Sequence, residues 1–436
     1  MKYMQFILLT GMGMMLFVAT MLPVAAQADG LPVQDYSQLS VSEAQLEVCS
    51  KQKQPAYAEV RRAIHSKQYE SALEQLGEPV KGKSNPEFGI TNYLYGKILY
   101  LQAYQRVNER TSEEPDQSKL AEAKKYITLA AKNGFSEAIY DQAMLLVEPA
   151  NTAQKLNLLK AAAKAQFAPA MLKLAEEYFH ATKTFEERLE AQALVQQAAS
   201  IDTDAKIQLA SYYLHEEKPL NSLTGYDKDI GKAVTLLHEA ASDCNASAAY
   251  KLFQMSMAEH KPNDLPTDRA VYWLETSSKL GLAKAQGDLA EHYYHEKKDS
   301  EMAAYWALLG AEKGDLKALL TLGKLYYQGL GIEKDFSKAL EYYEQALSID
   351  IHNRLVLNQL GIMYYKGEGS EVDFRKAASL CERAANKGQA GCQYYLGLMY
   401  VNGEGVTQDI DTGISWMKKS AAQDFPVAKN WLRENW

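Results

Sequence analysis

The chain has 436 residues, of which 47% are hydrophobic and 23% charged, and its formal net charge at pH 7 is −8. This length allows one large core, several domains or the continuous core of a repeat protein. Because the sequence has no basic tract and no positive excess, it argues against nucleic-acid binding and against binding to anionic membrane surfaces. Four cysteines are too few for a scaffold held together by disulfides.

The first 28 residues are typical of an export signal. Lys2 supplies the positive charge, an apolar run covers Phe6–Leu22, and "AQA" before Asp29 offers small residues for cleavage. We therefore expect cleavage after Ala28 and a periplasmic or secreted mature protein with no integral membrane span. The apolar run is nearly long enough to cross a membrane, so an uncleaved anchor is the alternative.

Residues 29–51 contain few periodic apolar positions and are predicted to form a flexible N-terminal arm. Within 52–133, "YAEVRRAIHSKQYESALEQL" has the apolar spacing of a degenerate helix pair. Farther along the chain two landmarks recur. One is Leu-[Gly/Ala]-x-x-Tyr on a first helix, and the other is an alanine pair that ends a second helix shortly before a turn.

The turns after the second helices recur at steps of 32 to 42 residues. They fall at Gly134, Gln166, Asp202, Cys244, Gly281, Gly314, Asp350, Gly388 and Asp424. A period of 20–50 residues is the signature of stacked repeats, in which each unit buries its apolar face only against its neighbours. The sequence therefore predicts an all-α solenoid of about nine helix pairs.

Three copies of the pattern carry two glycines around one residue, in "QGLG", "KGEG" and "NGEG". Glycine-rich turns before helices also bind phosphate. Here the residues before Gly367 have helical rather than strand spacing, and no lysine and Ser/Thr pair follows Gly369. Glu371 and Asp373 would repel a phosphate. We therefore interpret these segments as turns between two helices and call them elbows.

Each elbow has residues suited to a helix end and to a helix start. The first glycine follows a helix directly, where a left-handed turn costs other residues about 1–2 kcal/mol. The predicted N-caps of the second helices are Asp335, Asp373 and Asp409. The glycines predicted to let the paired helix cross closely are Gly323, Gly361 and Gly397. Glu368, between the two glycines of its elbow, is expected to tolerate replacement by alanine.

These residues resemble the Sel1-like repeat, a subfamily of the tetratricopeptide helix pairs. Its pattern is A-x-x-x-L-G-x-x-Y-x-x-G-x-G-V-x-x-D-x-x-K-A-x-x-W-x-x-K-A-A. The match is strong over 318–425, looser over 134–317, and degenerate over 52–133; a capping helix is expected over 426–436. The resemblance implies an all-α, right-handed α/α superhelical solenoid and an exported bacterial member of the family.

The resemblance also implies where partners bind. In the tetratricopeptide pattern the position after the packing tyrosine faces the concave groove. The residues at this position, with their polar neighbours, are Phe179, Tyr294, His295, Tyr327, Gln328, Tyr365 and Lys366. Aromatic rings there are predicted to pack a partner peptide or to stack on sugars. The alternative is that the rings only fill a tight superhelix.

No catalytic, cofactor-binding or metal-binding residue is predicted. Ser415 and Lys418 match S-x-x-K, the nucleophile pair of penicillin-recognising enzymes, but no S-D-N or K-T-G segment accompanies them. His292 and His295 could lie on one helix face, but the sequence offers no third metal ligand. A cation or polar group at a helix C-terminus is the simpler role for His295.

Cys381 and Cys392 are 11 residues apart, late in a second helix and early in the next first helix. In cysteine-rich members of the family a disulfide joins adjacent helices at a spacing of eight. Both a disulfide and two packed thiols remain open, because bridging needs Cα atoms within about 7 Å. Cys244 occupies a turn and is a candidate exposed thiol, and the pairing of Cys49 stays open.

The resulting hypothesis is an exported, non-catalytic scaffold or adaptor without cofactors. It binds one or more envelope proteins or peptides along its concave face, with polysaccharide as a further possible partner. By analogy with the family, the system served is an envelope secretion or exopolysaccharide system. The alternative is a cell-envelope hydrolase of the β-lactamase or peptidoglycan-active kind.

Overall fold

The computed structural model describes residues 58–65, 68–78, 87–108, 115–146, 151–181, 184–215, 223–258 and 269–436. The predicted signal segment 1–28 and arm 29–51 lie outside these residues. The helices are α2 (Ala58–His65), α3 (Tyr69–Leu76), α4 (Phe88–Asn108), α5 (Gln117–Lys132), α6 (Ser136–Met144), α7 (Thr152–Lys164), α8 (Ala168–Ala181), α9 (Phe185–Ile201), α10 (Thr203–Leu214), α12 (Ile230–Ser242), α13 (Ala246–Met257), α14 (Ala270–Lys279), α15 (Ala283–His292), the π-helix η6 (Tyr293–Lys297), α16 (Ser300–Ala311), α17 (Leu316–Gln328), α18 (Phe336–Ile349), α19 (Arg354–Lys366), α20 (Phe374–Asn386), α21 (Ala390–Asn402), α22 (Ile410–Ala421) and α23 (Pro426–Asn435).

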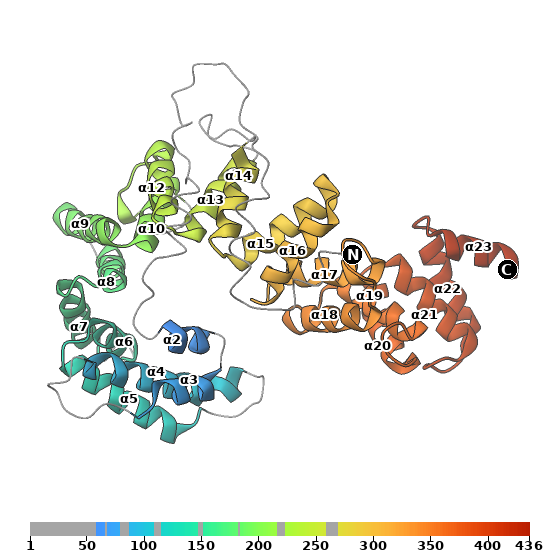
Figure 1. Ribbon diagram of the computed structural model, residues 1–436, viewed down its shortest axis with the longest axis horizontal. Coiled ribbons are helices and arrows are strands. Elements are labelled where there is room, and N and C mark those ends of the chain that lie inside the picture. Colours follow the sequence, from blue (N-terminus) through green and yellow to red (C-terminus); the bar gives the residue numbers. More distant parts are fainter. Residues whose placement is uncertain are drawn as a thin grey trace, which may run out of the picture. The chain divides into compact units, whose positions relative to one another are not determined.

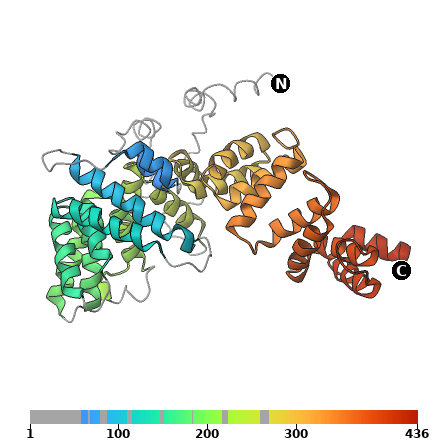
Figure 2. The same cartoon turned by 90° about the horizontal axis from the view of Figure 1, so that it is seen from below.

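Successive helices pack as pairs in the described part of the chain, from α2 with α3 to α21 with α22 (Figure 1). Each second helix also contacts the first helix of the next pair, so the stack is continuous from one pair to the next. The same order of helices can be followed in the turned view of Figure 2. The described residues contain no β-strand, and the predicted all-α solenoid is confirmed.

Glycines on the first helices lie where the second helix of the same pair crosses. A Cβ atom at Gly323 would lie 2.6 Å from the ring of Tyr343 on α18, and one at Gly397 would lie 2.6 Å from Cγ of Met417 on α22. Since real Cβ atoms essentially never approach a neighbour this closely, these positions accept only glycine without a shift of the paired helix. The prediction of close helix crossing is confirmed.

The elbows end one helix and start the next as predicted. Gly367 is the C-cap of α19, with φ 72° and ψ 29°, and its N–H donates to the carbonyl oxygen of Met363. Asp373 then accepts a hydrogen bond from the backbone N–H of Lys376 and caps α20. Two repeats without glycine elbows place other residues in the left-handed conformation, His215 after α10 and Lys298 after η6.

The second glycine of each elbow makes a contact between repeats. Gly369 has φ 87°, and a Cβ atom there would overlap the carbonyl group of Phe336, the first residue of the preceding second helix. Gly331 and Gly405 stand in the same relation to the backbones of Ser300 and Phe374. The elbow therefore lets the backbones of neighbouring repeats touch, which no other residue type would allow.

The core runs through the stack and does not form separate globules. One cluster of buried side chains extends from Leu319 on α17 to Met399 on α21 and includes residues of three successive pairs. At the C-terminal end, Trp431 and Leu432 of α23 pack against a buried cluster that contains Met417 of α22. The segment boundaries predicted at residues 28, 51, 133, 317 and 425 stay predictions.

Among the described residues, no helix combines the length and the apolar character that crossing a bilayer requires. The apolar run Phe6–Leu22 and the cleavage site after Ala28 fall outside these residues.

We expect Gly369→Ala to destabilise the protein more than Gly388→Ala. Both glycines have positive φ, 87° and 84°, but a Cβ atom at Gly388 has no neighbour within 4 Å. Gly388→Ala should cost only the left-handed penalty of about 1–2 kcal/mol, and Gly369→Ala should add overpacking of about 1–3 kcal/mol. Chemical denaturation of the two variants measures the difference. Equal losses would contradict the contact between repeats.

Candidate functional site

The structure separates the predicted groove residues into two groups. Phe179 is fully buried in the core and packs edge to face against Tyr212, with ring centroids 6.1 Å apart. The prediction that Phe179 contacts a partner is therefore wrong, because neighbouring helices already cover its ring. Tyr294, Tyr327 and Tyr365 are half-buried, and their predicted polar neighbours are exposed. These neighbours are His295, Gln328 and Lys366.

The three half-buried tyrosines, which we call the tyrosine ladder, each donate a hydrogen bond to the next repeat. Tyr294 on η6 donates to Oε1 of Gln328 over 2.8 Å. Tyr327 on α17 donates to Oε2 of Glu368 over 2.8 Å, and Tyr365 on α19 donates to Oε2 of Glu404 over 2.9 Å. Each hydroxyl thus joins the end of one first helix to the end, or the elbow, of the next.

The middle residue of the elbow decides which acceptor the tyrosine meets. Glu368 and Glu404 are the middle residues of their elbows and accept directly. The elbow after α17 has Leu330 there, and Gln328, two positions earlier, takes over as acceptor. Glu368 is thus half-buried and bonded, so its expected tolerance of alanine is at odds with the structure. The sequence signal for this role is the pairing of an elbow glutamate with a tyrosine in the preceding repeat.

The rings of the ladder also fill space between helices. Tyr327 packs edge to face against Phe336 at a centroid distance of 5.2 Å, and Tyr365 packs against Phe374 at 5.3 Å. Tyr365 also lies 5.0 Å from the ring of Tyr395 on the next first helix. Truncating these rings would therefore leave cavities and cost stability, whatever part the exposed ring edges play in binding.

A surface with apolar and cationic side chains lies along the first helices. We call it the first-helix face: residues spaced three, four and seven apart on α15, α17, α19 and α21 share one side of each helix. Leu355 is 50% exposed, and three other aliphatic side chains on this face are half-buried. These are Leu320, Ile362 and Leu398. Direct contacts join α15 to α17 and α19 to α21, so the face passes from one repeat to the next at these two steps.

Charges on this face are mostly paired. Lys317 forms ion pairs with Asp288 at 2.7 Å and Glu291 at 2.9 Å. These hydrogen bonds and charges outweigh the opposing effect of burial and raise the pKa of Lys317 to about 12. Lys366 lies 3.7 Å from the elbow carboxylate of Glu368. Asp288, one of the two carboxylates paired with Lys317, also accepts a hydrogen bond of 2.5 Å from the hydroxyl of Tyr250, which holds it in place.

The candidate catalytic and metal-binding residues lie apart from this face or lack partners for chemistry. Ser415 and Lys418 are both exposed on α22, no hydrogen bond joins them, and the Lys418 ammonium lies 5.5 Å from the ring centroid of Trp436. His295 is exposed beside Tyr294, with ring centroids 4.7 Å apart. Within the described ranges, no three His, Cys, Asp or Glu side chains cluster as metal ligands would.

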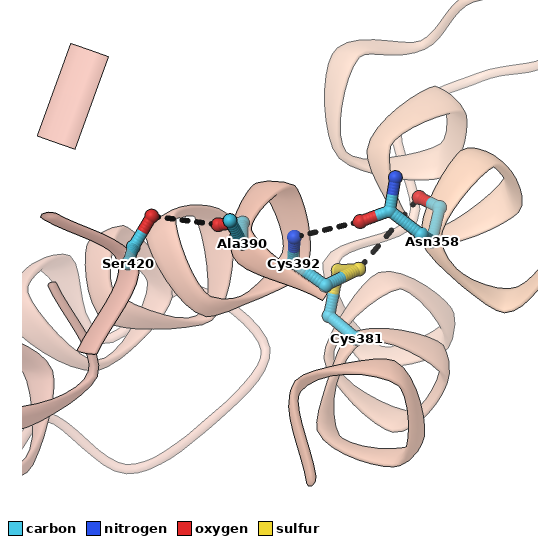
Figure 3. Close-up of a disulfide and its surroundings, with 5 residues drawn as sticks. All are labelled: Asn358, Cys381, Ala390, Cys392 and Ser420. Atoms are coloured by element: carbon cyan, nitrogen blue, oxygen red, sulfur yellow. Dashed lines mark hydrogen bonds between the residues drawn. A yellow bond between two sulfur atoms is a disulfide. The ribbon is translucent and has the colours of Figure 1, made fainter. Parts of the chain in front are cut away.

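A disulfide joins Cys381 on α20 to Cys392 on α21, with Cα atoms 4.7 Å apart (Figure 3). Both cysteines are completely buried, and Asn358 on α19 accepts a hydrogen bond of 2.9 Å from the backbone N–H of Cys392. One covalent bond and one hydrogen bond thus hold α19, α20 and α21 together. Cys244 is disulfide-bonded as well, so its interpretation as an exposed thiol is wrong.

The Sel1 repeat model matches seven consecutive segments of the chain, which together cover more than half of it. They are residues 168–201, 203–243, 246–282, 283–315, 316–348, 356–389 and 390–425. The chain belongs to the Sel1 repeat family. Sel1 repeats typically form non-catalytic scaffolds, and this Sel1 repeat protein has a scaffold suited to protein–protein interaction.

Two curated proteins are similar over part of their length. The chitin synthase regulator SKT5 of Saccharomyces cerevisiae is 28% identical over 263 residues, which cover 57% of this chain and 36% of the regulator. Chitin synthase regulatory factor 3 of Schizosaccharomyces pombe is 23% identical over 253 residues, which cover 56% of this chain and 22% of that factor. The chain therefore spans well under half the length of either relative.

Two solved structures are also similar to this chain. A Sel1 repeat protein from Oxalobacter formigenes has a TM-score of 0.44 and 21% identity, with 83% of this chain and 99% of that chain covered. The protective antigen c5321 of uropathogenic Escherichia coli has a TM-score of 0.43 and 19% identity, with 92% of this chain and 90% of the antigen covered.

We expect the tyrosine ladder to make this Sel1 solenoid sensitive to alkali. Burial first, then the hydrogen bond to Glu368 and its charge, raise the pKa of Tyr327; burial and Glu404 do the same for Tyr365. A pKa raised in the folded state means that the hydroxyls stabilise the fold fully below about pH 10, the value for free tyrosine. This stabilisation is lost as the pH rises through the folded pKa.

The double variant Tyr327→Phe with Tyr365→Phe measures this effect, because it keeps the rings and removes the hydroxyls. Its melting temperature should be lower than that of the unchanged protein at pH 7, and the difference should shrink above about pH 10. Thermal melts followed by circular dichroism across this range provide the comparison. A difference that stays constant in alkali would contradict the hydrogen-bonding role of the hydroxyls.

Proposed function

We propose that the protein is an exported, non-catalytic scaffold that binds protein partners on its first-helix face. The supporting observation is that this face has one exposed apolar side chain, Leu355. Half-buried aliphatic side chains lie on three consecutive repeats of the same face, at Leu320, Ile362 and Leu398. Leu355 is half exposed to solvent at 50%, and Ile362 lies two turns farther along the same side of α19. Exposed apolar side chains that line up across rigid repeats are suited to a partner segment that runs along the stack.

The locked joints support the same function. Hydrogen bonds from the tyrosine ladder and the disulfide between Cys381 and Cys392 hold successive first helices in a defined order. A preformed surface loses little conformational entropy when it binds, so moderate contacts are enough for useful affinity. Binding and not chemistry is the role that such an arrangement of residues favours.

We further propose that the partners belong to an envelope secretion or exopolysaccharide system, with polysaccharide as a second class of partner. The names of both curated relatives describe regulators of chitin synthase. This supports an accessory role beside an enzyme or an assembly, with the enzyme itself on another chain. We propose a periplasmic or secreted location on the strength of the export signal that the sequence predicts over residues 1–28.

N-terminal sequencing of the protein from cell fractions tests the export proposal. The expected result is a mature chain that begins at Asp29 in the soluble envelope or secreted fraction, because "AQA" precedes this residue. A chain that still begins at Met1 and sediments with membranes would show an anchor instead. A chain retained in the cytoplasm would refute export altogether.

Leu355→Glu tests the binding face, with Ile410→Glu as its matched control. The two side chains are equally exposed, at 50% and 52%, but Leu355 lies on a first helix and Ile410 on the second helix α22. Because neither is buried, both variants should keep the melting temperature nearly unchanged. In pull-downs from envelope extract, Leu355→Glu should lose captured partners that Ile410→Glu retains. Equal capture by both variants would place the binding surface elsewhere.

A further inference from the structure

One joint of the tyrosine ladder lacks the carboxylate that the other two possess. Tyr327 and Tyr365 donate to Glu368 and Glu404, the middle residues of their elbows. Tyr294 faces an elbow whose middle residue is Leu330, and it donates to the neutral amide oxygen of Gln328. We call this place, formed by Tyr294, Lys324, Gln328 and Leu330, the open joint.

The open joint carries positive charge without a matching acid. Lys324 lies over the ring of Tyr294, with its ammonium 5.8 Å from the ring centroid. Among the described residues it forms no ion pair within 4.0 Å, whereas Lys366 lies 3.7 Å from Glu368 at the next joint. His295 is exposed against the same tyrosine ring. The three side chains shown to interact with Tyr294, those of Lys324, His295 and Gln328, thus include no carboxylate.

A buried hydroxyl without a partner lies beside the open joint. The side chain of Tyr343 is 1% exposed, and its hydroxyl makes no hydrogen bond to any described residue. Burial raises the pKa of Tyr343, and the nearby Tyr294 and Tyr327 raise it further. An unpaired buried hydroxyl is costly. The Tyr343 hydroxyl is therefore left without a hydrogen-bond partner among the described residues beside this joint.

We propose that the open joint binds a carboxylate of a protein partner, the side chain of an aspartate or glutamate, in the place that Glu368 and Glu404 occupy at the next two joints. This inference rests on the proposed function and names the chemistry of the partner. The chain completes two joints with its own glutamates, and the partner completes the third.

The residues of the open joint suit a carboxylate. The Tyr294 hydroxyl turns from the Gln328 oxygen to the incoming anion, the Gln328 amide offers its N–H groups, and Lys324 supplies the charge. Hydrogen bonds to an ionised group are shorter and about twice as strong as neutral ones. Leu330, 42% exposed, packs against the methylene groups of the entering side chain. An amide in place of the acid would lose the ionic part of this binding.

The first test uses the elbow sequence of the chain itself as a probe. The peptide NGEGVT, acetylated and amidated so that its glutamate is the single charge, is titrated into the full-length protein and followed by tyrosine NMR signals. The control peptide is NGQGVT. Saturable binding of the glutamate peptide, about tenfold tighter than the glutamine peptide, supports the proposal. Equal binding of both peptides, or no saturable binding of either, overturns it.

The second test fills the site from within. Leu330 is not among the residues with positive φ, so other side chains fit its backbone. Leu330→Glu should place a carboxylate beside Tyr294, raise the melting temperature and abolish binding of NGEGVT. Leu330→Met keeps an apolar side chain of similar size and should leave peptide binding unchanged. Equal binding by the two variants overturns the proposal.

These outcomes are separate from those of the proposed function. If the open joint does not bind a carboxylate, the glutamate peptide fails while Leu355→Glu still disrupts partner capture. If the scaffold function is wrong, no partner is captured by the unchanged protein, and the peptide titration reports on the open joint alone.

Lys324→Gln tests the role of the cation. This variant should weaken binding of NGEGVT about tenfold, and unchanged binding would overturn the role of the cation.

Discussion

The close approach of two backbones at each elbow is the constraint on which the stacking of the C-terminal repeats depends. The second elbow glycine, as at Gly369, lies against the first residue of the preceding second helix with no room for a Cβ atom. Since the position also needs positive φ, glycine satisfies two independent demands at once. This contact sets how far each repeat is displaced from the one before.

The displacement in turn brings the tyrosine ladder within reach of its acceptors. Gly369 lies against Phe336, and this contact brings the residue before Gly369, Glu368, to the hydroxyl of Tyr327. The edge-to-face contact of Tyr327 with Phe336 belongs to the same junction. Backbone contact, aromatic packing and hydrogen bond are thus three parts of one joint. A change in any of them is expected to loosen the other two.

This coupling explains why binding and stability are hard to separate on the first-helix face. The ladder tyrosines were predicted as a binding surface, and their rings and hydroxyls also hold the stack together. Leu355 differs from them because half of its surface is exposed and the joints do not involve it. Variation among the joints is therefore a better guide to function than the shared residues. The replacement of the elbow glutamate by Leu330 is such a variation.

The sequence by itself determined the local features of this protein. The period of the repeats, the helix ends at glycine and the aspartate caps all follow from residues close together in the chain. Their physical causes, backbone strain and unpaired N–H groups at a helix start, act over a few residues. The elbow at Gly367 and the N-cap at Asp373 could therefore be predicted from the sequence alone.

Only the tertiary structure decided which aromatic residues are covered and which hydroxyls are bonded. Phe179 and Tyr327 occupy the same repeat position, yet Phe179 is fully buried and packs against Tyr212, whereas Tyr327 is only half-buried. The ladder hydrogen bonds join residues 34 to 41 positions apart, and their partners depend on how far each repeat is displaced. The disulfide between Cys381 and Cys392 likewise could be decided only from the distance between α20 and α21, which places the two Cα atoms 4.7 Å apart. These features depend on distances between repeats, which no local pattern of residues encodes.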